Sequence, residues 1–207
     1  LGLICCNFAL HSKSSKTRLL NEYNSHPKGL SFVVIGMNDE KSPLFPDEVR
    51  RLISEHRIFS GGRRHRELVG ELLPEGAVWI DIVVPLSDVY AQYRHYDEPV
   101  LVFASGDPLF FGFTTTLMRE FEGRVTKTFP SFSSLQMLAH ALRLPYHDMR
   151  VVSLTGRPWH EFDRALIERA HKVGVLTDRK NTPATIAKRM LDYGYTAYQM
   201  HVGVLLG

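Results

Sequence analysis

The sequence predicts an α/β fold with a mainly parallel sheet, because short apolar runs alternate along it with segments of helical periodicity. The clearest run, Val100–Ala104, has five consecutive apolar residues and suits a strand buried on both faces. It stops at the small-residue loop Ser105–Pro108 (SGDP), and Leu109–Phe121 follows as an apolar, helix-compatible segment. Sheets of this class bind ligands where a strand ends in such a loop and a helix begins. We therefore expect the binding site here.

The SGDP loop has two interpretations. In the first, Asp107 is the N-cap and Pro108 the first residue of the helix, an arrangement that needs no ligand. In the second, the loop approaches a bound molecule. Gly106 favours the second interpretation, because a residue without a Cβ atom lets a ligand come close to the backbone.

The first half of the chain alternates between strand and helix patterns. The helix expected after the first strand has Asp47 and Glu48 in its first turn, where the helix dipole favours negative charge. The second strand is short and stops at Gly61 and Gly62. In chain order we predict a strand at Ser31–Gly36, a helix at Pro46–His56, a strand at Arg57–Ser60, a helix at Arg64–Leu73, a strand at Ala77–Val84, a helix at Ser87–Tyr96, and strands at Glu98–Ala104 and Arg124–Phe129.

The second half continues the alternation after an amphipathic helix at Ser133–Leu142 and a domain joint at Leu144–Asp148. One stripe of that helix is apolar and consists of Leu135, Leu138, Ala139 and Leu142. Beyond the joint we predict a strand at Arg150–Leu154, a helix at Trp159–Ala170, a strand at Val173–Thr177, a helix at Thr182–Tyr193 and a strand at Tyr195–Leu205. The predicted domains are an irregular extension at 1–30, an N-terminal α/β domain at 31–143 and a C-terminal α/β domain at 148–207.

The last predicted strand, Tyr195–Leu205, is long and apolar, and nothing in the sequence after it could pair with it or cover it. An open sheet edge with apolar side chains promotes association. We therefore expect the C-terminal domain to be incomplete at Gly207, and the chain to be less stable than a longer version.

The composition places only broad limits on the class of protein and on its partners. A share of 44% hydrophobic and 23% charged residues is typical of soluble globular proteins, and no apolar run approaches the ~18–20 residues of a membrane span, so we expect no membrane partner. The net charge of +3, with ten histidines in addition, favours an acidic partner only slightly. The two cysteines, Cys5 and Cys6, are adjacent, which argues against a disulfide framework or a metal site and is compatible with a reducing cytoplasm.

The first 30 residues differ from the rest. They open with the apolar LGLICCNFAL and then become basic around Lys13, Lys16 and Arg18. A signal peptide has the opposite order, with its positive charge before the apolar stretch. We interpret the segment as an irregular extension, with a peripheral membrane contact as the minor alternative.

Five segments, in the same order, resemble motifs of the tetrapyrrole methylase family. The SGDP loop resembles the family's Gly-Asp-Pro motif, and PSFSSLQ at 130–136 resembles its Pro-x-x-Ser/Thr-Ser/Ala turn. SGGRRH at 60–65 and SLTGR at 153–157 resemble segments of one branch, the precorrin-6Y or cobalt-precorrin-7 methyltransferases. LTD at 176–178, with NTP at 181–183, fits the strand and loop that come next. The resemblance covers residues 31–207.

This resemblance implies two α/β domains with the cofactor cleft between them, and S-adenosylmethionine (SAM) as methyl donor without a metal. It implies C-methylation at carbon 5 of a precorrin or cobalt-precorrin ring, in cytoplasmic cobalamin biosynthesis. A homodimer is expected because the family is generally dimeric, and a carbon-15 methyltransferase/decarboxylase domain or subunit is a further expected partner. Methyl transfer from a sulfonium needs positioning more than acid–base groups, so the lack of paired carboxylates does not argue against an enzyme.

The cofactor residues are carried over from the matching motifs. They are Gly36, Ser105, Gly106, Asp107, Phe110, Ser133, Ser134, Leu154, Thr155 and Leu176. Structural roles are the alternative for several, since the serines can cap the following helix and the leucines can belong to a core. The family's first strand usually ends in Gly-x-Gly-Pro-Gly, whereas Gly36 is followed here by Met37, Asn38, Asp39 and Glu40. That departure puts the role of this loop in doubt.

Three arginines are candidates for holding the carboxylates of a corrin precursor. Arg63 and Arg66 belong to an RRHR cluster at a predicted helix start, where cations are unusual, and Arg157 belongs to the branch's Gly-Arg pair. Arginine binds carboxylates through two parallel hydrogen bonds. A solvated helix start or an ion pair is the alternative for each.

No catalytic residue is assigned. His65, His147 and His160 are too widely spaced to suggest a metal site, and we expect structural roles for them.

Two other functions stay open. An RNA-modifying methylase of the same fold would account for the basic charge, but basic residues are not interleaved with stacking aromatics, so we expect no nucleic-acid partner. A non-catalytic partner subunit with a degenerate SAM site would account for the altered Gly36–Glu40 loop.

Overall fold

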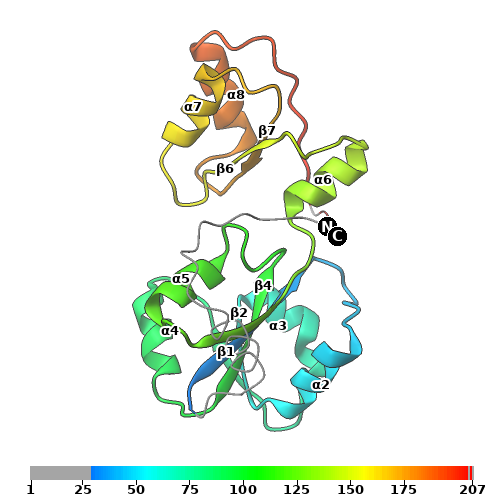
Figure 1. The fold of residues 1–207 in the computed structure, drawn as a ribbon, viewed down its shortest axis with the longest axis vertical. Coiled ribbons are helices and arrows are strands. Elements are labelled where there is room, and N and C mark those ends of the chain that lie inside the picture. The colour runs from blue at the N-terminus through cyan, green and yellow to red at the C-terminus, as the bar shows by residue number, and fades with distance from the viewer. Residues whose placement is uncertain (1–28, 205, 207) are drawn as a thin grey trace, which may run out of the picture.

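The computed structural model describes residues 29–204 and 206, so the predictions made for Cys5, Cys6 and the rest of residues 1–28 lie outside it. The first half of the chain forms a five-stranded parallel sheet with the strand order β3-β2-β4-β1-β5 (Figure 1). Its strands are β1 (Ser31–Met37), β2 (Ile58–Gly61), β3 (Val78–Asp81), β4 (Pro99–Ser105) and β5 (Val125–Phe129). The predicted α/β class and parallel sheet are confirmed.

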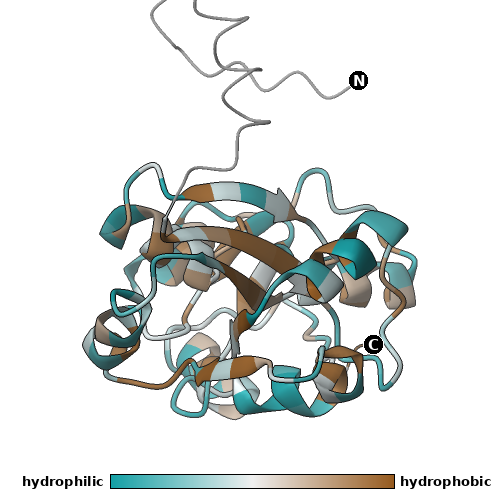
Figure 2. Ribbon diagram, turned by 90° about the horizontal axis from the view of Figure 1, so that it is seen from below, coloured by the Kyte–Doolittle hydropathy of each residue, from teal (hydrophilic) through white to brown (hydrophobic). Residues whose placement is uncertain are grey.

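Apolar side chains of the central strands alternate between two cores, one on each face of the sheet. The helices that cover the faces are α2 (Asp47–Glu55), α3 (Arg63–Val69), α4 (Leu86–Tyr93) and α5 (Phe113–Glu120). Along β1, Phe32 and Val34 share a core with α4 and α5, whereas Val33 and Ile35 share a core with α2 and α3. Burial on both faces explains why the strands are continuous apolar runs, visible as the brown centre of Figure 2.

The two pairs of helices define where the sheet opens. The helices after β1 and β2 cover one face, and those after β3 and β4 cover the other (Figure 1). In the sheet, β4 lies between β1 and β2. The helix after β4 therefore packs on one face of the sheet, whereas the helices after its two neighbours pack on the other. This change of direction creates a crevice at the carboxyl edge of a parallel sheet, which is where ligands bind in such folds.

A second, two-stranded parallel sheet pairs β6 (Arg150–Ser153) with β7 (Val173–Leu176). The helices α7 (His160–Ile167) and α8 (Pro183–Asp192) follow its strands, and α6 (Ser134–Leu142) lies between the two sheets (Figure 1). The core of this part contains Val152, Leu154, Phe162, Ala165, Leu166 and Ile186. The predicted joint at Leu144–Asp148 falls between α6 and β6.

The predicted strand at Tyr195–Leu205 is wrong for residues 195–204, which form no strand. Tyr195 and Tyr198 pack against the core of the second sheet instead, and the Tyr198 hydroxyl donates a hydrogen bond to the Ala170 carbonyl at 2.9 Å. An apolar run does not distinguish a paired strand from an extended segment held by its side chains. The open strand edge expected there is therefore not formed by these residues.

Of the two interpretations of the SGDP loop, the one in which Asp107 caps the following helix is wrong, because α5 begins only at Phe113, with Gly112 at its N-cap. The third strand is shorter than predicted and ends at Asp81.

Within residues 29–204 and 206, no helix is both long and apolar enough to cross a bilayer.

A buried hydrogen-bond chain links three parts of the first sheet. The Ser60 hydroxyl donates to the Ile80 carbonyl on the neighbouring strand at 2.7 Å, and the Tyr93 hydroxyl of α4 lies 2.6 Å from Ser60 Oγ. Burial raises the pKa of Tyr93, so its hydroxyl stays protonated and donates to Ser60. Ser60 is the first residue of the SGGRRH segment, and these two contacts give it a structural role.

We expect Ser60→Ala to lower the free energy of unfolding by about 1–3 kcal/mol, because it leaves the buried Tyr93 hydroxyl without a partner. Tyr93→Phe should have a smaller effect, since Ser60 keeps its bond to Ile80. Urea unfolding of both variants and of the double variant measures the coupling. Losses that simply add in the double variant would contradict the hydrogen-bond chain.

Candidate functional site

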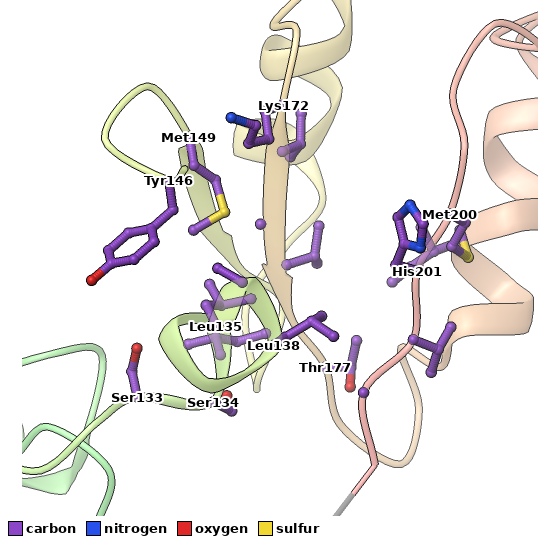
Figure 3. A pocket seen from close by; sticks show the side chains of 18 of the residues that line it. Ser133, Ser134, Leu135, Leu138, Tyr146, Met149, Lys172, Thr177, Met200 and His201 are labelled. Atoms are coloured by element: carbon purple, nitrogen blue, oxygen red, sulfur yellow. The ribbon is translucent and has the colours of Figure 1, made fainter. Parts of the chain in front are cut away.

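A cavity of about 1260 Å³ opens at the carboxyl edge of the five-stranded sheet and continues along α6 and β7. Its polar end is formed by Ser105–Asp107 at the end of β4 and just after it, and by Ser133 and Ser134 at the start of α6. An apolar arm follows Leu135 and Leu138 of α6 and the length of β7. Figure 3 shows Ser133, Ser134 and Thr177 at one end of this arm and Lys172 at the other.

The loop after β4 is a compact turn rather than a helix start. Gly106 has a φ of 65°, and its N–H donates to the Met37 carbonyl of β1 at 2.7 Å. The Asp107 carboxylate accepts the N–H of Leu109 at 2.9 Å, and the Asp107 carbonyl accepts that of Phe110 at 3.0 Å. Asp107 therefore organises the loop itself, which explains why it does not cap α5.

Two glycines let this loop pack against its neighbours. A Cβ atom at Gly106 would lie 3.1 Å from Ser133 Cα, on the chain that enters α6. A Cβ atom at Gly36 would overlap the Gly106 carbonyl and lie 2.8 Å from Pro108 Cδ. Gly36 thus brings the loops together from behind and does not line the cavity.

Ser133 and Ser134 have different surroundings although they are adjacent. Ser133 is buried and is the N-cap of α6: its hydroxyl accepts the Gln136 N–H at 3.3 Å, and the Gln136 side chain accepts the Ser133 N–H at 2.8 Å. This reciprocal pair is a capping box. Ser134 is exposed to the cavity and keeps its hydroxyl available for a ligand.

The second sheet contributes loops held by one carboxylate. Asp178 accepts backbone N–H groups of Gly156 at 2.9 Å, Lys180 at 2.9 Å and Asn181 at 2.6 Å, and these bonds lower its pKa. The Thr155 hydroxyl donates to the Thr177 carbonyl at 3.2 Å. The loops after β6 and β7 are therefore fixed to each other where they meet the cavity.

The structure brings most of the predicted cofactor residues together. Those on the cavity wall are Ser105, Gly106, Asp107, Phe110, Ser133, Ser134, Thr155 and Leu176. Gly36 and Leu154 are not on it, because Gly36 lies behind the loops and Leu154 is fully buried in the core of the second sheet. Met37, Asn38 and Asp39, whose role the sequence put in doubt, do line the cavity.

The predicted substrate arginines lie off the cavity wall. Arg63 and Arg66 are exposed on α3, and the guanidinium of Arg63 lies 3.7 Å from the Glu67 carboxylate. Arg157 donates to Ser153 Oγ at 2.9 Å, and its guanidinium lies 5.3 Å above the ring of Phe111, which does line the cavity. Of the three, only Arg157 lies at the rim.

The basic side chains on the wall were not predicted. They are Arg169, His171, Lys172 and His201. Lys172 pairs with Asp148 at 2.7 Å. These residues belong to no motif and no periodic pattern, so the sequence offered no signal for them. The described residues contain no group of three or more histidine, cysteine or acidic side chains placed to hold a metal ion.

His65 is in closer contact with the site than predicted. Its Nδ1 accepts the Gly62 N–H at 3.2 Å, and its Nε2 lies 2.9 Å from Ser105 Oγ, on the cavity wall. Burial lowers the pKa of His65, Asp39 raises it and Arg64 lowers it further. His147 and His160 are exposed on other parts of the chain.

Comparison with known proteins identifies relatives for most of the chain. Residues 32–205 match the family described as Tetrapyrrole (Corrin/Porphyrin) Methylases. A precorrin-6Y C(5,15)-methyltransferase (decarboxylating) of Sinorhizobium is 32% identical over 89% of this chain and 45% of its own length. A cobalt-precorrin-7 C(5)-methyltransferase of Salmonella typhimurium is 30% identical over 82% of both chains. The chain thus spans less than half of the Sinorhizobium relative.

Solved structures with the same fold are more distant in sequence. A precorrin-6Y methylase from Archaeoglobus fulgidus has a TM-score of 0.55 at 20% identity, covering 74% of this chain and 75% of its own. A uroporphyrin III C-methyltransferase from Thermus thermophilus has a TM-score of 0.54 at 22% identity, covering 80% and 77%. These similarities establish the fold.

We expect Gly106→Ala to destabilise the protein more than Gly123→Ala. Both glycines have a positive φ, so both substitutions incur the strain of about 1–2 kcal/mol that a side chain feels in this conformation. A Cβ atom at Gly123 meets open space, whereas one at Gly106 presses on Ser133. Urea unfolding measures both losses, and equal losses would show that the loops are not in close contact.

The lowered pKa of His65 predicts a pH-dependent stability. Because the unfolded chain takes up the proton near pH 6.5 and the folded chain only at lower pH, stability falls as the pH drops below about 6.5. One group contributes a slope of at most about 1.4 kcal/mol per pH unit. The difference between wild type and His65→Gln, measured by urea unfolding from about pH 5 to about pH 7.5, isolates this contribution. Parallel profiles would contradict it.

Proposed function

Since the chain belongs to the family of tetrapyrrole (corrin/porphyrin) methylases, we propose that it transfers a methyl group from SAM to carbon 5 of a precorrin or cobalt-precorrin ring in cobalamin biosynthesis. The observation that carries the proposal is the cavity wall, where the loop after β4, the start of α6 and the loops of the second sheet meet. The names of the Sinorhizobium and Salmonella relatives supply the carbon-5 specificity.

The residues at the polar end of the cavity fit SAM. The Gly106 turn presents backbone without a side chain, Ser134 and Thr155 present small polar groups, and Leu176 gives an apolar surface suited to an adenine ring. The whole cavity, at about 1260 Å³, exceeds the roughly 300–1,000 Å³ of a typical small-molecule site, which leaves room for a second, larger molecule.

The role of the protein in this reaction is positioning. SAM supplies a methyl group that is already activated by the sulfonium charge, so no acid or base is needed to make the donor reactive. The loops fixed by Gly36, Gly106 and Asp178 hold the cavity wall in one geometry, and rigid placement of two reactants contributes strongly to rate. The apolar arm along α6 and β7 offers apolar side chains for a bound macrocycle to pack against.

Arg157 is the substrate arginine that we retain as the first candidate. It lies over Phe111 at the rim, where a guanidinium can reach the acetate and propionate groups of a macrocycle. Arg63 and Arg66 stay in the proposal as outer contacts, since α3 begins at the same carboxyl edge of the sheet. The homodimer, the cytoplasmic location and the carbon-15 partner are part of the proposal and rest on the resemblance to the family.

Methyl transfer from isotopically labelled SAM to the isolated corrin intermediate, followed by mass spectrometry, tests the proposal. We expect one labelled methyl group on the ring, at carbon 5 by NMR, and no label on RNA offered in parallel. Calorimetric titration with SAM distinguishes an enzyme, which binds SAM, from a partner subunit whose degenerate site does not. Absence of SAM binding by the wild type would refute the assignment.

A further inference from the structure

His65 lies between the backbone at the start of α3 and the wall of the cavity. Its Nδ1 accepts the N–H of Gly62, the N-cap of α3, at 3.2 Å. Its Nε2 lies 2.9 Å from the hydroxyl oxygen of Ser105, the last residue of β4. Ser105 lines the cavity and His65 does not, so the imidazole contacts the site only from behind.

The contact with Gly62 determines which ring nitrogen carries the hydrogen. A backbone N–H can only donate, so Nδ1 must present its lone pair, and the neutral ring then carries its hydrogen on Nε2. Nε2–H consequently donates to Ser105 Oγ, and the hydroxyl hydrogen of Ser105 is free for another acceptor. Within the described part of the chain, Ser105 Oγ has no side-chain or backbone hydrogen-bond partner besides His65.

Protonation would break this arrangement. A second hydrogen on Nδ1 would face the Gly62 N–H, so two donors would oppose each other. Burial of the ring also lowers the pKa of His65, with Asp39 and Arg64 as the charged groups that act on it. The ring is therefore neutral near pH 7, and it has no lone pair directed toward the cavity with which to accept a proton.

We propose that His65 is a positioning residue that holds the Ser105 hydroxyl as a hydrogen-bond donor pointing into the cavity, toward an oxygen acceptor of the bound molecule. This rests on the proposed function. The acceptor is a carboxylate or hydroxyl oxygen, and SAM and the acid side chains of the macrocycle are its two sources. The same geometry rules out His65 as the base that receives the proton displaced when a methyl group replaces hydrogen on the ring.

Two substitutions at position 65 separate the two contacts of the ring. Asparagine places Oδ1 close to the position of Nδ1, so it can still accept from Gly62 but cannot reach Ser105. Glutamine places its amide nitrogen close to the position of Nε2, so it can still donate to Ser105 but no longer accepts from Gly62. Glu71→Gln, at an exposed position in the short 3-10 helix Gly70–Leu72 that follows α3, is the matched control.

Calorimetry measures the Kd of SAM, and steady-state kinetics measure the KM of the corrin intermediate. We expect His65→Asn and Ser105→Ala to raise either the SAM Kd or the corrin KM, each by the same factor of about 5 to 50. His65→Gln should restore most of the wild-type value. The double variant His65→Asn/Ser105→Ala should be no weaker than Ser105→Ala alone. A weaker SAM Kd places the acceptor on the cofactor, and an increased KM with unchanged SAM binding places it on the macrocycle.

Equal losses for the asparagine and glutamine variants, additive losses in the double variant, or no loss for either ligand would overturn the inference. The ring tautomer is an independent readout that needs no ligand: NMR of the protein with ¹⁵N-labelled histidine should show hydrogen on Nε2 of His65. A hydrogen on Nδ1 would also overturn the inference. Wild-type protein that shows the expected tautomer but does not bind SAM would refute the proposed function alone.

Discussion

The cavity depends on the close approach of three chain segments at Gly36 and Gly106. At Gly36 the end of β1 passes so near the loop after β4 that a Cβ atom would overlap the Gly106 carbonyl. At Gly106 the same loop packs tightly against the entry to α6, where a Cβ atom would lie 3.1 Å from Ser133 Cα. Because α6 leads to the second sheet, these contacts determine where the loops of that sheet meet the first.

Polar groups around the cavity have two separate tasks. Asp107 and Ser133 accept backbone N–H groups of their own segments, and Asp178 accepts those of its own loop and of the loop after β6, which keeps these loops in one conformation. Ser134 and Ser105 present hydroxyl groups to the cavity. A carboxylate near a binding site is thus no sign of acid–base chemistry here, and this agrees with a reaction in which the donor is already activated and the protein has to position it.

Much of the fold could be predicted because its strands are buried on both faces, which requires continuous apolar runs such as Val100–Ala104. The segment Tyr195–Leu205 shows the limit of this argument. It is also rich in apolar and aromatic residues, yet residues 195–204 form no strand, and it is Tyr195 and Tyr198 that pack against the core of the second sheet. For the site, eight of the ten residues carried over from the motifs line the cavity, whereas Leu154 is fully buried, because a motif does not reveal which of its residues face the core.

The sequence by itself determined the parallel α/β architecture, the family and the loops that form the cavity, because periodicity and short motifs are local properties of the chain. The tertiary structure alone decided which side chains reach those loops from elsewhere. His65 precedes Ser105 by forty positions and meets it only because β2 and β4 are neighbours in the sheet. Arg63 and Arg66, on the same helix, extend into solvent, since a helix directs successive side chains to different faces.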